Sequence, residues 1–110
     1  MKLRLFIILA STLCWVSVPA FAADIEAGKA KVTEVCGACH GMDGNSTSHD
    51  FPRLAGQNED YIRNALHSYQ TGARKNPIMT SMAEPLSKQD IENVAAYFSR
   101  QKGLFVKQDN

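Results

Sequence analysis

The feature that most constrains this chain is the run Cys36-Gly37-Ala38-Cys39-His40. Two thiols separated by two residues and followed directly by an imidazole form the C-x-x-C-H pattern of c-type haem attachment. In that chemistry each thiol adds to one vinyl group of the porphyrin, and the histidine binds the iron. Two covalent anchors and one ligand close together fix both the position and the rotation of the ring. The motif therefore predicts one covalently bound haem c per chain.

Two other chemistries use paired cysteines, namely thiol redox exchange and zinc binding. A thioredoxin-like pair lies at a strand-to-helix turn, and the chain shows no alternating strand pattern. A structural zinc site needs about four ligands. Besides these two cysteines, residues 23–110 offer only His40, His49, His67 and scattered carboxylates, and the third cysteine, Cys14, lies in the predicted signal peptide. Haem attachment is the favoured interpretation, and a non-haem thiol redox protein is kept as a rival.

Residues 1–22 are typical of a secretory signal peptide. Lys2 and Arg4 precede residues 5–18, which are almost wholly apolar, and Ala20-Phe21-Ala22 forms a small-x-small cleavage site. The apolar run is also shorter than the ~20 residues that a bilayer span requires. We expect cleavage after Ala22, export to the periplasm of a Gram-negative bacterium, and one mature domain, residues 23–110.

Charge and size exclude several classes of protein. The whole chain carries 12 basic and 11 acidic residues, and loss of Lys2 and Arg4 changes its formal net charge from +1 to about −1. That balance argues against a nucleic-acid or membrane-surface binder. A domain this small buries little apolar surface and usually needs additional stabilisation, such as a disulfide or a bound cofactor. A disulfide between Cys36 and Cys39 would close only a tiny loop and stabilise little, so a large cofactor is the better candidate.

The hydrophobic pattern predicts three helices and two irregular stretches. The helices are expected at about residues 25–35, 59–71 and 88–98, the second preceded by an asparagine cap and the third by a capping box. Residues 41–57 and 73–85 are rich in Gly, Pro, Asn, Ser or Thr. Ordered loops of that length are usually functional, and here we expect them to wrap around the cofactor.

A second iron ligand must come from further along the chain, and there are five candidates. Met42 lies too close to His40 in sequence to reach the opposite face of the haem. His49 in the first loop and His67 beside an apolar helical stripe are better explained as surface residues. Met79 and Met82 lie in the second loop, where no stripe explains them. Met79 is preferred as the ligand, with Met82 as the fallback packing against the ring.

Four stretches, taken in order, make the sequence resemble a class I c-type cytochrome. Within that class it is most similar to the bacterial branch called c-four, usually a two-haem protein built from two similar halves. The resemblance implies an all-α, class I cytochrome c fold with three main helices and long loops around one covalent haem. The sequence carries one C-x-x-C-H, as in a single-haem version of one half of that branch. The stretches are Cys36-Gly-Ala-Cys-His-Gly-Met-Asp-Gly-Asn-Ser46, Phe51-Pro-Arg-Leu-Ala-Gly-Gln57, Met79-Thr-Ser-Met82 and Leu86-Ser-Lys-Gln-Asp-Ile91 leading to Ala95-Ala-Tyr-Phe98.

The resemblance also implies roles for individual residues. His40 and Met79 are expected as axial ligands, and the carbonyl of Pro52 is expected to accept a hydrogen bond from the free ring nitrogen of His40. Related cytochromes cross their first and last helices closely, which would place Gly28 and Val32 against Val94 and Tyr97. Gly28, otherwise a weak point in its helix, then has a packing role.

The haem propionates lack an obvious partner. Many class I cytochromes carry a tryptophan near a propionate, but Trp15, the one tryptophan here, lies in the predicted signal peptide. Arg53, Arg74 and Lys75 are candidates for these contacts, with solvated surface charge as the alternative role.

Ligation by His40 and Met79 would leave no open position on the iron. We therefore expect a soluble monohaem electron carrier rather than an enzyme, a monomer that neither enters the membrane nor binds nucleic acid. Its expected partners are redox proteins: a membrane cytochrome complex, a terminal oxidase, or an exported reductase or dehydrogenase. The alternatives are a haem enzyme or a gas or peroxide sensor with a labile sixth ligand, or an electron-transfer subunit of one oxidoreductase.

Overall fold

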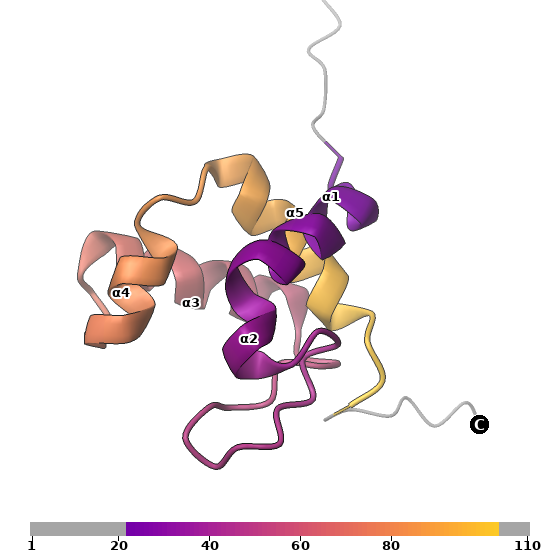
Figure 1. Cartoon of the computed structure of the whole chain (residues 1–110). Coiled ribbons are helices and arrows are strands. Elements are labelled where there is room, and N and C mark those ends of the chain that lie inside the picture. Colours follow the sequence, from indigo (N-terminus) through magenta and orange to yellow (C-terminus); the bar gives the residue numbers. More distant parts are fainter. Residues whose placement is uncertain (1–21, 104–110) are drawn as a thin grey trace, which may run out of the picture.

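The computed structural model describes residues 22–103, and within that range it contains helices and no strands. The predicted signal peptide lies outside the described residues apart from its last residue, Ala22. The all-α fold class is confirmed. In chain order the elements are α1 (Ile25–Lys31), a π-helical turn η1 (Val32–Cys36), α2 (Gly37–His40), α3 (Glu59–Thr71), α4 (Pro77–Ala83) and α5 (Lys88–Ser99) (Figure 1).

The first helix begins as the sequence predicts and then changes character. Asp24 caps α1, because its carboxylate accepts hydrogen bonds from the amides of Glu26 and Ala27 at 2.9 and 3.1 Å. From Val32 the chain forms a π-helical turn and continues through α2 to His40. The expected end near residue 35 is therefore wrong. A π turn holds one residue more than an α turn and often marks a functional site; here it leads directly into the cysteine motif.

The two longer helices form where the capping residues predict them. The side chain of Asn58 accepts from the amide of Tyr61 at 3.1 Å and starts α3, and Gly72 ends that helix in the left-handed conformation, with φ 76°. A complete capping box starts α5: the Ser87 hydroxyl accepts from the amide of Asp90, and the Asp90 carboxylate accepts from the amide of Ser87.

The stretch 73–85, expected as an irregular loop, contains the short helix α4. The side chain of Asn76 accepts from the amide of Met79 at 3.0 Å, and Pro77 occupies the first turn. These start signals are present in the sequence, but α4 has seven residues and buries one of them, Ala83. Such a helix shows no apolar stripe, which is why the hydrophobic pattern does not reveal it.

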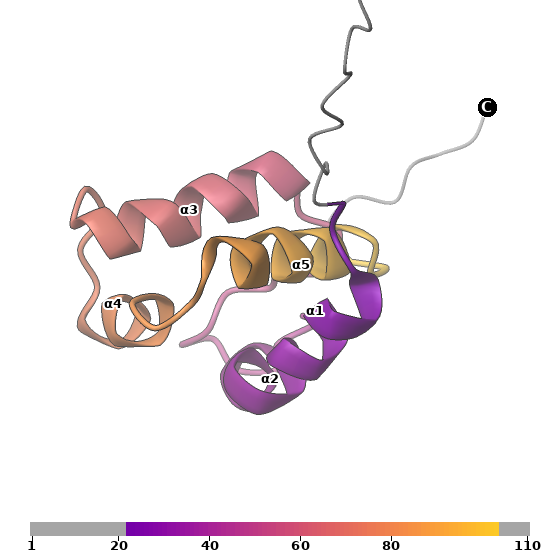
Figure 2. The same ribbon diagram turned by 90° about the horizontal axis from the view of Figure 1, so that it is seen from above.

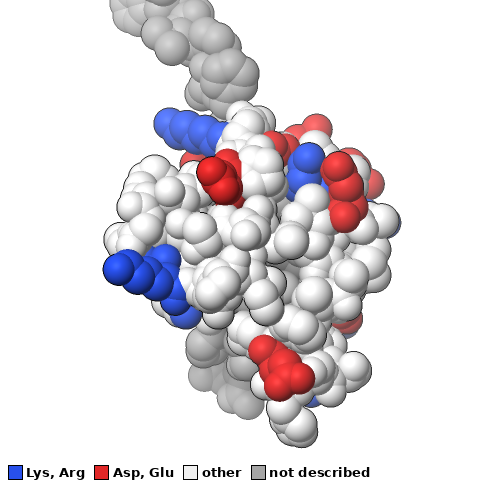
Figure 3. Space-filling model, turned by 60° about the vertical axis from the view of Figure 1, so that its left-hand side comes forward, with Lys and Arg blue, Asp and Glu red and all other residues white. Residues whose placement is uncertain are grey.

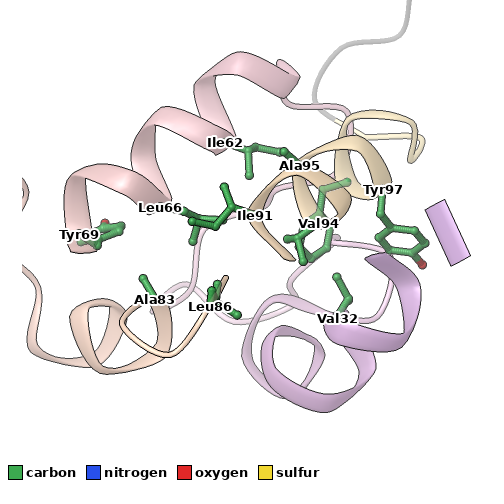
Figure 4. Packing of buried hydrophobic residues seen from close by; sticks show 11 residues of the cluster. Val32, Ile62, Leu66, Tyr69, Ala83, Leu86, Ile91, Val94, Ala95 and Tyr97 are labelled. Atoms are coloured by element: carbon green, nitrogen blue, oxygen red, sulfur yellow. The ribbon is translucent and has the colours of Figure 1, made fainter. Parts of the chain in front are cut away.

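The core forms where α5 meets α1 on one side and α3 on the other (Figure 2). At the crossing of α1 and α5, a Cβ on Gly28 would lie 2.2 Å from the carbonyl oxygen of Asn93 and 3.0 Å from the Cβ of Tyr97. Only glycine allows this approach, and Val32 of η1 is fully buried. The cluster drawn in Figure 4 joins η1, α3, α4 and α5: Val32, Ile62, Leu66, Tyr69, Ala83, Leu86, Ile91, Val94, Ala95, Tyr97 and Phe98.

The loop between α2 and α3 is fixed to this core by backbone hydrogen bonds. The carbonyl of Gly44 accepts from the amides of Leu54 and Ala55, and the amide of Gly56 donates to the carbonyl of Phe98 at 2.9 Å. The loop is thus closed on itself by the Gly44 bonds and fixed to α5 near its C-terminal end by the Gly56 bond. No helix within residues 22–103 is both long and apolar enough to cross a membrane.

Candidate functional site

A cavity of about 410 Å³ lies between α2 and its following loop on one side and α3 and α4 on the other. That volume is within the usual range of ligand sites. Most of the lining is apolar and comes from α3, α5 and the loops, including Leu54, Ile62, Leu66, Val94 and Phe98. The predicted site residues that also line it are Cys36, Cys39, His40, Pro52, Arg53, Arg74, Met79 and Met82.

The two cysteines approach the cavity from the end of η1 and from α2. Their spacing of three residues places both on one face of the helical segment, and both are free thiols. Burial raises the pKa of Cys36 to about 11, although the positive charge of Lys31 opposes the shift. Thiol redox proteins need the opposite, a thiolate stabilised at neutral pH. The protonation of Cys36 therefore argues against the thiol redox alternative.

His40, the last residue of α2, is nearly buried, with 6% of its surface exposed. Its Nδ1 donates a hydrogen bond to the carbonyl oxygen of Pro52 at 2.8 Å. With the proton held on Nδ1, the Nε2 lone pair is free for a metal. The ring of Phe51 packs edge-on against the imidazole, 6.2 Å between centroids. These contacts fix both the orientation and the tautomer of a residue that lines the cavity.

Ser46 is a structural residue of the site that the sequence did not single out. It is 5% exposed, and its hydroxyl lies 3.4 Å from the carbonyl oxygen of Cys39 and 3.2 Å from that of Ser48. Arg53 Nε donates to the carbonyl of Ser46 at 3.3 Å. Ser46 thus ties the loop to the cysteine motif and holds Arg53 at the cavity wall. A serine in a polar loop carries no sequence signal for such a role.

The two methionines of α4 line the cavity. Figures 1 and 2 show that α4 and α2 are separate segments of the fold that do not lie against each other. Met79 is partly buried and packs against the core, whereas Met82 is 42% exposed. Among the described residues, no three His, Cys, Asp or Glu side chains gather where they could hold a metal ion. A zinc site therefore finds no support. The donor side chains at the cavity are the two thiols, the imidazole of His40, and the thioethers of Met79 and Met82.

The other candidate iron ligands lie away from the cavity lining. Met42 is 49% exposed, and its carbonyl accepts a hydrogen bond from the Tyr97 hydroxyl at 2.9 Å. His49 and His67 are exposed. None of these three candidate ligands is among the lining residues.

Two arginines bring positive charge to the cavity wall. Besides Arg53, the guanidinium of Arg74 lies over the ring of Tyr69, 5.0 Å from its centroid. The pKa of Arg74 is raised, chiefly by hydrogen bonding with the Tyr61 side chain. Lys75 is exposed and is not part of the lining.

These features together fit haem c. The walls are apolar, the two thiols lie beside the imidazole, and a soft thioether lines the same cavity from α4. Cationic side chains at the wall suit the carboxylates of a porphyrin.

Comparison with known proteins agrees with this geometry. The family model for cytochrome c matches residues 25–102. Cytochrome c4 from Stutzerimonas stutzeri is 52% identical over 91 residues, covering 74% of this chain and 43% of that protein. Cytochrome c-554(548) from Halomonas halodenitrificans is 40% identical, covering 74% of this chain and 100% of that protein. The crystal structure of reduced recombinant cytochrome c4 from Pseudomonas stutzeri aligns with a TM-score of 0.69 at 50% identity, covering 76% of this chain and 48% of that one.

The chain thus spans about half the length of the cytochrome c4 proteins that it matches, and the full length of the shorter relative. Covalently bound haem c is the cofactor that this similarity implies, and Cys36 and Cys39 lie in the attachment motif. Because the family model covers nearly all of the described residues and the solved relative shares the helical fold, the chain belongs to the cytochrome c family.

Proposed function

We propose that this chain is a periplasmic carrier of single electrons. The observation that supports the proposal is that one cavity is lined by both cysteines of the attachment motif, by His40 and by Met79. When bound, haem c supplies a reversible Fe(III)/Fe(II) couple. The chain's own residues would attach the group, ligate its iron and shield it from water.

The proposed roles follow from the geometry. Cys36 and Cys39 would form the two thioethers, His40 would offer Nε2 to the iron, and Pro52 holds the imidazole through its carbonyl oxygen. Met79, which lines the cavity from α4, would be the second ligand of the iron. Its thioether favours the ferrous state and so raises the reduction potential relative to two histidines. Because two side chains would ligate the iron, no position on it would remain for a substrate, and we propose that the protein is not an enzyme.

The wall arginines are proposed to bind the propionates. Arg53 is already oriented by Ser46, and Arg74 by the ring of Tyr69. Both guanidinium groups offer several N–H donors to a carboxylate. Lys75 lies outside the lining, so we assign it no direct contact with the cofactor.

The proposed location and partners follow from export and from the protein surface. We propose that residues 1–22 direct the chain to the periplasm and are removed. Proteins of this family work with redox partners, here proposed to be a membrane cytochrome complex together with a terminal oxidase or an exported reductase or dehydrogenase. The face seen in Figure 3 carries only scattered charges of both signs around a largely uncharged centre. Such a face favours small, short-lived contacts with weak dependence on ionic strength.

Carbon monoxide distinguishes this carrier from a haem enzyme or sensor. The reduced mature protein is exposed to carbon monoxide, and its visible spectrum is compared with that of the untreated sample. A carrier with two side-chain ligands keeps its spectrum and shows a reversible one-electron wave in voltammetry. Formation of a carbon monoxide complex by the unmodified protein would instead support the sensor or enzyme alternative.

A further inference from the structure

Gln70, on the last turn of α3, connects that helix to both ends of the segment between α4 and α5. Its side-chain Nε2 donates to the carbonyl oxygen of Ala83 at 2.9 Å and to that of Leu86 at 2.8 Å. Ala83 is the last residue of α4, and Leu86 directly precedes the N-cap of α5. Both hydrogens of one amide group are thus used to hold the C-terminal end of α4.

The helix α4 depends on such contacts for its position. A helix of seven residues is not stable by itself in water. At its N-terminal end it is capped by Asn76, an exposed residue, and Ala83 is its one buried residue. The contacts that hold α4 against the rest of the fold are therefore the packing of Met79 and Ala83 and, at its C-terminal end, the two hydrogen bonds from Gln70. Met79 lies four residues before Ala83, so the two side chains share one face of α4.

We propose that Gln70 is a positioning residue for the sulfur of Met79. By fixing the end of α4 against α3, it sets the position from which Met79 reaches the cavity. Gln70 does not line the cavity itself, so its effect passes through α4. This inference rests on the proposed function, in which Met79 is an axial ligand. Loss of the two hydrogen bonds frees α4 to move, and the iron–sulfur bond becomes easier to displace.

Two substitutions remove the donors in different ways. Gln70→Leu removes both without adding charge, and Gln70→Glu keeps the length of the side chain while replacing the donating group by an acceptor. Gln101→Glu is the matched control, because Gln101 Nε2 donates to the carbonyl of Tyr97 at 3.0 Å near the end of α5, away from the cavity. A variant that yields no holoprotein is replaced by Gln70→Asn, whose shorter side chain does not reach both carbonyls.

The measurement is a titration of the oxidised mature holoprotein with imidazole, followed through the far-red absorption band of methionine bound to ferric iron. Both Gln70 variants are expected to bind imidazole about tenfold more tightly than the unmodified protein, the loss expected for one to two hydrogen bonds. Their far-red band is expected to weaken before any imidazole is added. Gln101→Glu is expected to match the unmodified protein in both respects.

Met79→Ala, measured in parallel, separates the ligand assignment from the role of Gln70. If Met79→Ala keeps the far-red band, the ligand assignment itself is wrong. If Met79→Ala loses the band while both Gln70 variants keep it and keep the unmodified imidazole affinity, Gln70 has no positioning role. A lower melting temperature in the Gln70 variants would not rescue that role, because a purely structural contribution would produce it as well.

Discussion

Substitution of Gly28 by alanine tests the helix crossing that places the cysteine motif. Gly28 lies in α1, where the added Cβ would stand 2.2 Å from the carbonyl oxygen of Asn93 and 2.7 Å from its carbonyl carbon. Both are backbone atoms of α5, so no side chain can rotate away. On the other side the Cβ of Tyr97 is 3.0 Å distant. The two helices must therefore separate, and η1 and α2 follow α1 directly in the chain.

The size of the effect follows from two opposing terms. Overpacking in a well-packed core costs about 1–3 kcal/mol, and contact with backbone on a fully buried crossing places this site at the upper end. Alanine regains about 1 kcal/mol of helix propensity over glycine. The net expectation is a loss of about 2 kcal/mol in the free energy of unfolding. For a domain of this size that corresponds to a melting temperature lower by about 10 °C.

Gly37→Ala provides the matched control. Gly37 also has helical backbone angles, with φ −65°, but the nearest atom to its added Cβ is the sulfur of Met42 at 2.3 Å, and the nearest backbone atom, the carbonyl oxygen of Val32, is 3.1 Å away. That sulfur lies near the end of a flexible side chain that is 49% exposed, so it can move away. We expect a change within about 1 kcal/mol, since helix propensity offsets the adjustment. Thermal unfolding of both oxidised holoproteins, followed by circular dichroism, measures the difference. Equal melting temperatures for the two variants would refute the proposed constraint at the crossing.

Three further predictions concern the site and its surroundings. Met79→Ala is expected to lower the reduction potential and to let the reduced protein bind carbon monoxide, whereas Met82→Ala is expected to change both properties much less. Voltammetry measures the potential, and visible spectra measure carbon monoxide binding. A larger effect of Met82→Ala would make Met82 the iron ligand in place of Met79. Arg74→Gln is expected to lower the potential by on the order of tens of millivolts, because a positive charge near the iron disfavours the ferric state. Lys75→Gln, outside the lining, is expected to shift the potential less, and an equal shift would remove the proposed contact of Arg74. The pKa of Asp90 is lowered, chiefly by hydrogen bonds from its N-cap serine, so its contribution to stability is complete above about pH 4 and is lost as the pH falls further. Asp90→Asn is expected to reduce stability by roughly 0.3–1.5 kcal/mol at pH 7 and to weaken the acid dependence; an unchanged pH profile would contradict this.

The parts of the fold that the sequence predicted are those with strong local signals. The Asn58 cap and Gly72 bracket α3, and the reciprocal bonding of Ser87 and Asp90 starts α5, because each of these interactions involves residues close together in the chain. The close approach at Gly28 was also expected, although only from the resemblance to known cytochromes.

The parts that it missed depend on contacts between distant segments. The Asn76 cap and Pro77 at the start of α4 are local signals. The other end of the helix is held by Gln70, whose side chain binds two carbonyls that lie 13 and 16 residues further along the chain. Ser46 likewise acts through a carbonyl in the cysteine motif. Polar side chains of this kind have no periodicity, and their partners are determined only when the helices are packed.

The same distinction applies to the site residues. Cys36, Cys39 and His40 follow from one contiguous motif, whereas the preference for Met79 over Met82 rests on the sequence and stays a prediction. Among the candidate methionine ligands of the iron, the structure places Met79 and Met82 at the cavity and Met42 outside its lining. Among the candidates for contact with the haem propionates, Arg53 and Arg74 line the cavity and Lys75 does not.

The most direct test of the central claim is the visible spectrum of the oxidised, unmodified mature holoprotein in the far red. Ligation of the iron by His40 and Met79 predicts the absorption band that arises from a methionine sulfur bound to ferric iron. Haem present without this band would show that the sixth position is open or filled by another group. That result would contradict the electron-carrier account and would favour a haem enzyme or sensor.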